Sequence, residues 1–449
     1  MAYRYRYTQI AAGVVFLLMP GKVCGQFAGP SAPNVPAVAS GQMPTATPGA
    51  DATRSNMFSA SLEAGARYDD NAIISSTTKR SDIGYSFRPN FSMLQTFRRF
   101  DYGVSYSPGI DVSQHGLFAD QFTNMFSGHF TWLVSKHSSL SVQQNYVLST
   151  DPFQQFGSQP FGTTPGPVVA PNQSVFLPSV RRTANLSQAQ YSYQPRQHTT
   201  LGLSGNYTLS HYGSTSSSSG TNPTLLGFQV ASGQAYVAQQ ITPRNQIGVQ
   251  YSGQVLKFQQ VSARTTTHSF SVFDEIRLTP HTNLTLYAGP QYALIFNQAN
   301  LNVGFAVVTI PIRENTLSWS GGAIYQITGR RGAMVLNYSH GVSDGGGLTG
   351  AVQLDTGSAR FNWKLSPNWS MKMDLAAANN QLLGVKTSAG QFRSYSATLG
   401  FGRRIYRNMS MNMFFERLNQ VGSIVGLSSG NHDLAGISVS YDFSRPIGR

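Results

Sequence analysis

The segment from Phe100 to Ser113 constrains the fold more than any other part of this chain, because its side chains alternate between two kinds. Its apolar set is Phe100, Tyr102, Val104, Tyr106, Pro108, Ile110 and Val112, and the residues between them are small, polar or acidic. Successive strand side chains point to opposite faces, so the pattern predicts a strand with one apolar and one polar face. At about 13 residues it exceeds the usual globular strand and is long enough to cross a bilayer at a tilt.

The same alternation recurs along most of the chain. It begins at Phe58, returns from Ile83 to Met93, and continues after the first long strand. We predict further strands at 121–134, 139–149, 183–194, 199–210, 227–240, 246–257, 267–279, 283–296, 314–327, 332–341, 351–365, 368–378, 392–405, 408–418 and 432–443. The total is about eighteen strands, within a range of 16–18.

The connections between these strands are of two kinds. Short basic or proline-containing turns, such as Ser135-Lys136-His137 and Tyr406-Arg407-Asn408, alternate with longer loops rich in Gly, Ser and Asn. Short periplasmic turns and long extracellular loops are typical of outer-membrane barrels. An open sheet would leave unpaired backbone groups at its edges, and these are costly in hydrocarbon. The sequence therefore predicts an all-β, transmembrane, antiparallel up-and-down β-barrel over residues 57–443, wide enough to enclose a lumen.

Charged residues make up 11% of the chain, far below the roughly 25% of a typical globular protein. The formal net charge is +14, but the basic residues are dispersed and several lie in short turns, which favours a solvated rim. The aromatic residues alternate with Gly and Ser rather than with Lys and Arg, so we expect no nucleic-acid partner. No run of about 18 apolar residues follows the N-terminus, so no transmembrane helix is predicted.

The N-terminus resembles an export signal. Arg4 and Arg6 precede an apolar stretch at 10–19, and we predict a signal peptide over 1–25 with cleavage after Gly25. A lipoprotein signal at Cys24 is the alternative. Residues 26–56 are rich in Pro and Ala, which predicts a flexible periplasmic linker. The predicted location is the outer membrane of a Gram-negative-type bacterium, where lipid and lipopolysaccharide are the surroundings.

Charged residues on the polar face of the predicted strands are candidates for the lumen wall. They are Glu63, Arg67, Arg88, Asp101, Asp111, Arg277, Arg360, Lys364, Lys372 and Asp374. They would set a mild preference for anionic or neutral solutes, although mixed charges that merely solvate a wall are an equally simple reading. Asp274 instead falls on the apolar side between Val272 and Ile276, where a carboxylate facing lipid is costly. Either a bulge shifts the register there or the residue faces a subunit contact.

The connection at 150–180 is unusually long and apolar. It contains six prolines and four phenylalanines, Phe153, Phe156, Phe161 and Phe176. Loops of this length are uncommon and are usually functional. We predict that it folds into the barrel mouth and narrows it. The alternatives are that it lies over the outer rim or packs on a neighbouring subunit.

The last predicted strand carries Ile437, Val439, Tyr441 and Phe443 in strict alternation. This is similar to the aromatic-ended final strand by which outer-membrane barrels are recognised, so we expect the barrel insertion machinery as a partner. Residues 444–449 extend past the terminal phenylalanine as a short tail.

The sequence contains none of the common catalytic or metal-binding motifs CxxC, HExxH, P-loop or GxSxG. An enzyme at the barrel rim would need a His near a nucleophile or an acid, and the candidates are His129, His268 with Ser269, His340, and His432 with Asp433. At strand ends and in loops such residues are ordinary, so we predict no enzyme, no metal and no cofactor.

The segment from Gly65 to Asn71, Gly-Ala-Arg-Tyr-Asp-Asp-Asn, is followed by Arg80-Ser81-Asp82 and a strand containing Pro89. It resembles the opening of the β-barrel porin 2 family, whose members are outer-membrane barrels, some associated with capsule or exopolysaccharide production. The resemblance implies that Asp69, Asp70 and Asn71 lie where a strand meets an external loop. They are candidates for binding a cation or a saccharide, and an Asx turn is the structural alternative.

Two functions fit these observations. The first is a porin-like channel for passive diffusion of small hydrophilic solutes or saccharides. The second is a non-conducting or gated barrel of an exopolysaccharide or capsule export system, with export proteins or polysaccharide as partners. Conductance of the purified protein separates the two.

Overall fold

The structure of the chain is a computed structural model. The structure describes residues 56–71, 79–114, 121–149, 181–213, 226–259, 261–303, 306–344, 351–383, 390–422 and 429–446. The predicted signal peptide, the linker up to residue 55 and the predicted constriction loop with Phe153, Phe156, Phe161 and Phe176 lie outside these ranges. Among the described residues, no helix has the length and apolar character needed to cross a membrane.

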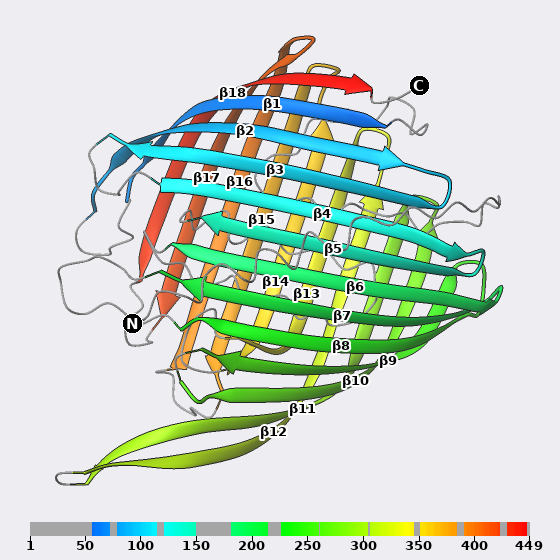
Figure 1. The fold of residues 1–449 in the computed structure, drawn as a ribbon, viewed down its shortest axis with the longest axis vertical. Coiled ribbons are helices and arrows are strands. Elements are labelled where there is room, and N and C mark those ends of the chain that lie inside the picture. The colour runs from blue at the N-terminus through cyan, green and yellow to red at the C-terminus, as the bar shows by residue number, and fades with distance from the viewer. Residues whose placement is uncertain are drawn as a thin grey trace, which may run out of the picture. The chain divides into compact units, whose positions relative to one another are not determined.

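The described ranges form eighteen strands (Figure 1). They are β1 (Met57–Asp69), β2 (Asp82–Thr96), β3 (Phe100–Ser113), β4 (Gln121–Ser135), β5 (Ser138–Ser149), β6 (Arg182–Arg196), β7 (Thr199–Tyr212), β8 (Phe228–Gln240), β9 (Asn245–Phe258), β10 (Arg264–Thr279), β11 (Thr282–Val303), β12 (Ala306–Thr328), β13 (Gly332–Asp344), β14 (Ala351–Lys364), β15 (Trp369–Leu382), β16 (Gln391–Tyr406), β17 (Met409–Gly422) and β18 (Gly430–Pro446). The predicted strand count is confirmed, and β3 has the bounds predicted for the opening segment.

Each strand pairs antiparallel with the next along the chain, and the first pairs with the last. On β1, Leu62 lies opposite Pro89 of β2 and Tyr441 of β18. The ring is therefore closed, so each of these strands has a neighbour on both sides. Closure satisfies the backbone groups that an open sheet would expose at its edges. The predicted antiparallel up-and-down barrel is confirmed.

The two faces of the wall differ in the way that the alternation predicted. Large apolar side chains at alternate positions of a strand, which we call the outward parity, are exposed, for example Phe122 at 65% and Trp319 at 50%. Polar side chains at the positions between them, which we call the inward parity, are buried, for example Asp111 at 6%. Because the exterior of a barrel is convex and its interior concave, the exposed apolar set faces outward and the polar set faces inward.

The two ends of the barrel have different connections. At one end, which we call the turn end, adjacent strands are joined by residues 97–99, 136–137, 197–198, 241–244, 280–281, 329–331, 365–368 and 407–408. The connections at the opposite end, the loop end, are longer, except for residues 304–305. Met57 pairs with Pro446 at the turn end, so the barrel begins and ends there.

Hydroxyl side chains shape several turns at the turn end. Ser135 Oγ accepts a hydrogen bond from the backbone N–H of His137 at 3.1 Å, and Thr279 Oγ1 accepts one from His281 at 3.2 Å. Thr242 Oγ1 accepts the N–H of the residue three positions later at 3.0 Å. A Ser or Thr before a turn can in this way replace a backbone acceptor, which explains why these tight reversals follow hydroxyl residues.

The hairpin of β11 and β12 is longer than predicted. We expected strands ending at 296 and starting at 314, whereas β11 runs to Val303 and β12 starts at Ala306. β12 pairs with β13 only over Gly321–Thr328, so the rest of the hairpin extends beyond that neighbour (Figure 1, yellow-green). The reason is visible in the composition of residues 307–312, where valine and isoleucine favour strand over loop.

Two other details bear on the predictions. β18 continues through Ser444 to Pro446, because these residues pair with the first residues of β1, so half of the predicted tail belongs to the barrel. At Asp274 the pairing of β10 with both neighbours is continuous, and the nearest irregularity lies between Arg277 and Thr279. A bulge therefore does not turn Asp274 inward.

Candidate solute pathway inside the barrel

The strand register places all ten predicted lumen residues on the inward parity. It brings most of them into two ionic clusters on different parts of the wall. Asp101 lies near the turn end, 3.8 Å from His129 Nε2, and Arg277 lies at the turn end of β10. The sequence indicated the strand parity of these residues, but it did not indicate which charges would meet.

The first ionic cluster lies on β1, β2 and β3. Arg88 Nη2 donates to both carboxylate oxygens of Asp111, at 3.0 and 3.2 Å. The side chains of these two residues are 17% and 6% exposed, and Glu63 lies directly opposite Arg88 in the register. Arg67 extends over Gly84, where a Cβ atom would lie 2.9 Å from its Nε. The cluster therefore combines two carboxylates with two guanidinium groups.

The second ionic cluster lies on β14 and β15. Arg360 Nε and Asp374 Oδ1 are 2.7 Å apart, and Lys372 Nζ lies 3.2 Å from the other oxygen of the same carboxylate. Arg360 is opposite Asp374 in the register, which explains the short contact. Lys364 lies nearer the turn end of the same wall, opposite Ser370. One carboxylate here faces two cations, so this part of the wall is more positive than the first cluster.

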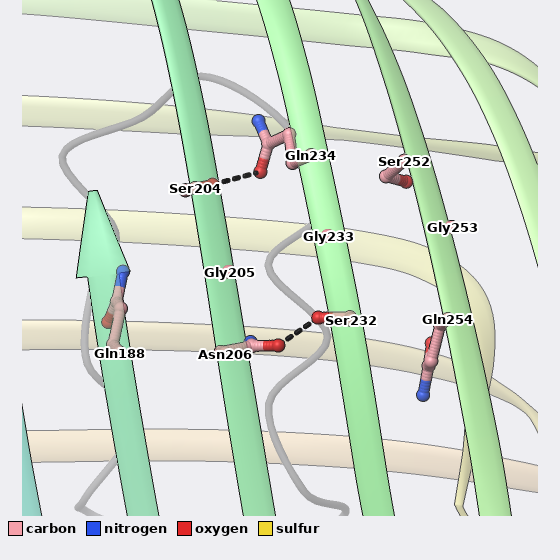
Figure 2. Close-up of a pocket in the computed structure, with 10 residues that line it drawn as sticks. All are labelled: Gln188, Ser204, Gly205, Asn206, Ser232, Gly233, Gln234, Ser252, Gly253 and Gln254. Atoms are coloured by element: carbon pink, nitrogen blue, oxygen red, sulfur yellow. Dashed lines mark hydrogen bonds between the residues drawn. The ribbon is translucent and has the colours of Figure 1, made fainter. Parts of the chain in front are cut away.

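A third part of the inner wall, on β6 to β9, carries amide and hydroxyl groups (Figure 2). It forms a shallow hollow with a cavity volume of about 20 Å³. The lining residues are Gln188, Ser204, Gly205, Asn206, Ser232, Gly233, Gln234, Ser252, Gly253 and Gln254. Ser204 Oγ donates to Gln234 Oε1 at 3.4 Å, and Ser232 donates to Asn206. None of the residues that line the hollow is charged, and we did not single out any of them from the sequence.

Three glycines lie beside the hollow at outward-facing positions of their strands, so they add only backbone to its wall. Gly205, Gly233 and Gly253 lie opposite one another on β7, β8 and β9. A Cβ added to Gly205 or Gly233 would have its nearest neighbour 3.8 to 4.0 Å away, so these positions are not crowded. The residues before and after each glycine are polar and face inward. The backbone of the three glycines therefore separates two rows of polar side chains on β7, β8 and β9.

Aromatic rings lie against the inner wall on the turn-end side of this hollow. Tyr236, Phe273 and Tyr287 form a cluster in which the first two rings meet edge-on, with centroids 6.3 Å apart. A Cβ at Gly202 would lie 2.0 Å from a carbon of the Tyr236 ring, and one at Gly248 would lie 2.2 Å from Phe273. These glycines allow the rings to lie flat on neighbouring strands, a device known from designed barrels.

The loop end of the interior is buried and partly apolar, which strict alternation did not predict. Phe228, Val352 and Phe392 have no exposed surface, although they lie on the inward parity. Phe228 and Phe392 belong to a cluster of buried residues near the loop end, which we call the buried belt. Its core members are Tyr212, Leu226, Phe228, Val230, Leu256, Phe258, Ala293, Val342, Ala351 and Phe392. The sequence signal is an apolar residue at the last two inward-facing positions of a strand, as at Leu256 and Phe258 on β9.

Asp69, Asp70 and Asn71 join β1 to β18 at the loop end. Asp69 Oδ1 accepts the N–H of Asn71 at 3.0 Å, which is an Asx turn, and lies 2.6 Å from His432 Nε2. Asp70 Oδ1 accepts the N–H of Asp433 at 2.6 Å. Asn71 has no exposed surface. Among the described residues no group of His, Cys, Asp and Glu could hold a metal ion. A role in binding saccharide or cation stays a prediction for these three residues.

The histidines considered for catalysis lie apart from one another. His268 faces outward, 2.7 Å from the hydroxyl of Tyr251, whereas Ser269 faces inward. His432 and Asp433 point to opposite faces for the same reason, because neighbouring strand residues alternate. His340 stacks on Trp319 and lies 2.6 Å from Asp355. Neither adjacent pair can therefore act together on one substrate atom.

The outer surface agrees with a lipid environment. On the last strand Ile437, Tyr441 and Phe443 are 45%, 56% and 49% exposed, and they lie on the same face as Leu62 of β1. Exposed apolar side chains occur on strands around the ring, and an area of that size is unfavourable in water. A closed ring with an apolar exterior and a polar interior defines a transmembrane β-barrel.

No protein-family model and no curated protein matches the chain. Among solved structures it is similar to OccK2 (OpdF) of Pseudomonas aeruginosa, with 12% identity and a TM-score of 0.41 over 87% of this chain and 98% of that one. It is also similar to the ferric-catecholate import receptor Fiu of E. coli K12, with 9% identity and a TM-score of 0.42 over 86% and 81%. A likeness at this level carries no argument, and fold, substrate and mechanism rest on the residues of this chain.

Proposed function

We propose that this protein is an outer-membrane channel through which small hydrophilic solutes diffuse passively. The observation that carries the proposal is the sidedness of the closed wall. Its outer face is apolar, and its inner face carries many Ser, Gln and Asn side chains and paired ions beside one aromatic cluster. Barrels of 16 to 18 strands leave room for an aqueous channel, and an amide- and hydroxyl-rich wall suits water better than a dry core.

The ionic clusters support weak rather than strong selectivity among ions. Arg88 is paired with Asp111, and Arg360 and Lys372 share Asp374, so the fields of opposite charges cancel in part at short range. The excess of cations in the second cluster favours anions slightly over cations. A neutral solute would experience little of this field.

The burial of the loop end favours a second candidate function, a gated or non-conducting barrel of a polysaccharide export system. Inward-facing side chains near the loop end are buried on many strands, including polar ones such as Ser210, Ser394 and Asn380. A wall that is withdrawn from solvent at one end conducts less than an open cylinder. In this reading the turn end would be a vestibule that contacts periplasmic partners.

Recordings from the purified, signal-cleaved protein in planar bilayers separate these functions. We expect discrete conductance steps in 1 M KCl and swelling of liposomes in solutions of small neutral solutes. Heat-denatured protein added in the same detergent is the control. The absence of both conductance and swelling would contradict the channel proposal and support the gated candidate. Membrane fractionation and N-terminal sequencing of the mature chain test the outer-membrane location and cleavage after Gly25.

A further inference from the structure

We propose that the amide-hydroxyl wall on β7 to β10 binds a neutral polyhydroxylated solute, a saccharide, during its passage. The proposal rests on the channel function proposed above and adds a site and a substrate class to it. The site comprises the hollow of Figure 2 and the row of residues directly below it toward the turn end. Its key side chains are Gln234, Gln250 and Ser271.

The first observation is hydrogen-bonding capacity that no described residue satisfies. Gln250 is 1% exposed, and neither its Oε1 nor its Nε2 has a hydrogen-bond partner. Ser271 is also 1% exposed, and its Oγ has none. These two residues lie opposite each other on β9 and β10. Buried polar groups are nearly always hydrogen-bonded, so two adjacent exceptions on a channel wall indicate a place for an external partner.

The second observation places this pair beside the hollow. Gln234, which lines the hollow, has a buried Nε2 without a partner, while its Oε1 accepts from Ser204. Gln234 lies opposite Ser252, the inward-facing residue two positions after Gln250 on the same strand. The unpartnered groups therefore form one set across three adjacent strands, β8, β9 and β10, and Gln234 connects this set to the lining of the hollow.

The chemistry of these groups selects the class of ligand. A glutamine amide offers both donors and an acceptor, and a serine hydroxyl can act as either. A saccharide presents many hydroxyls that can likewise donate and accept, so it can satisfy such a field at several points. An anion could use only the donors, and a cation only the acceptors. None of the residues that line the hollow is charged, whereas the ionic clusters lie on β1 to β3 and on β14 and β15.

The third observation is an aromatic ring at the edge of the field. Tyr236 lies opposite Gln250 on β8, and its ring packs against the wall over Gly202. Binding sites for small molecules combine aromatic faces with a few placed polar groups. The carbon-bound hydrogens on one face of a sugar ring can pack on an aromatic ring while its hydroxyls reach the amides. Tyr236 and Gln250 provide that combination side by side.

The test uses maltotriose, a neutral trisaccharide, on the purified full-length barrel in planar bilayers. We expect maltotriose to cause current fluctuations with a saturable concentration dependence. In the double variant Gln234→Leu/Gln250→Leu we expect apparent affinity to fall roughly tenfold or more, as for the loss of one or two hydrogen bonds. Conductance in KCl without sugar should change little. The matched control is Gln326→Leu, an inward-facing glutamine near the turn end of β12, which should leave affinity unchanged.

Trigalacturonate, an anionic trisaccharide, tests the preference for neutral ligands. Equal affinity for both sugars, or equal loss of affinity in the double variant and the control, would overturn the proposal. A wall that holds only ordered water would give neither fluctuations nor heat in calorimetric titration with maltotriose, and this result also overturns it. If the protein forms no channel, calorimetry on the detergent-solubilised barrel still tests the site, so that binding without conductance refutes the channel and retains the saccharide site. Ser271→Ala provides a smaller substitution should the double variant fail to fold.

Discussion

Replacing Asp274 with leucine is expected to stabilise the barrel. Asp274 lies opposite Ile247 on β9 and Leu286 on β11, and its neighbours on the same face of β10 are Val272 and Ile276. The pairing is continuous through this point, so the side chain points outward with the apolar set. Its Oδ1 is buried and has no hydrogen-bond partner among the described residues. The carboxylate therefore lies among apolar side chains on the outward face, and at least one of its oxygens has no hydrogen-bond partner among the described residues.

The size of the effect follows from the position of the residue along the strand. Asp274 lies five residues before Thr279, where β10 ends at the turn end. At about 3.3 Å per residue and a tilt near 40°, this is about 12 Å above that end. The lipid-facing band of such barrels is about 25 Å tall, so the carboxylate lies within it. Basic residues at the midplane cost about 2–4 kcal/mol and acidic ones less, so we expect a gain of about 1–2 kcal/mol in the free energy of unfolding.

The measurement is reversible urea unfolding in lipid vesicles, followed by tryptophan fluorescence. Asp433→Leu is the control, because this carboxylate also lies on the outward parity with a buried Oδ1 that has no hydrogen-bond partner among the described residues, but it is near the loop end and its Oδ2 lies 3.7 Å from Arg417 Nη1. We expect no gain for the control. An unchanged or lowered stability of Asp274→Leu would refute the reasoning and would show that the carboxylate has a partner in the membrane. Cross-linking in the same vesicles would then test the subunit contact.

Three further predictions concern the inner wall. Asp374→Asn should leave Arg360 without its anion, so the reversal potential in a KCl gradient should shift toward chloride, and no shift would mean that this cluster does not face the conducting path. Arg88→Met should lower the free energy of unfolding by about 3 kcal/mol, because it strands a buried carboxylate, and urea titration in vesicles measures this loss. Gly248→Val should abolish the heat-modifiable folded band on gels, since its Cβ would lie 2.5 Å from a backbone oxygen of β8, whereas Gly205→Ala, at an uncrowded position, should retain the band.

The sequence predicts the architecture well because period-two alternation is local information. The predicted strand at 100–113 matches β3, because the polarity of each residue indicates whether it lies on the apolar or the polar face of the strand. Once one face is apolar on many consecutive strands, the exclusion of open edges from hydrocarbon leaves a closed ring as the solution. The outward set on the last strand, such as Tyr441 and Phe443, follows from the same rule.

Contacts within the interior could not be predicted, because they depend on register between strands. That Arg88 and Asp111 face the same side follows from parity, but their pairing requires the alignment of β2 with β3. The same holds for Arg360 and Asp374 on β14 and β15. The hollow was missed for a different reason. Serine, glutamine and asparagine occur throughout the polar parity of this chain, so nothing in the sequence distinguishes Gln234 from the others.

The buried belt at the loop end departs from simple alternation. We expect most of the electrical resistance of the proposed channel to lie at this belt. Phe228, Leu256 and Phe258 are nearly inaccessible, whereas Ser232 and Ser252, further from that end on the same strands, retain partial exposure. The saccharide wall and the loop-end belt are therefore arranged in series along the barrel axis. A ring of eighteen strands sets the maximum width, and we expect the buried loop end to limit the current. Sugar added from the turn-end side should accordingly reach its site without crossing the belt, and sugar added from the loop-end side should cause fluctuations less often.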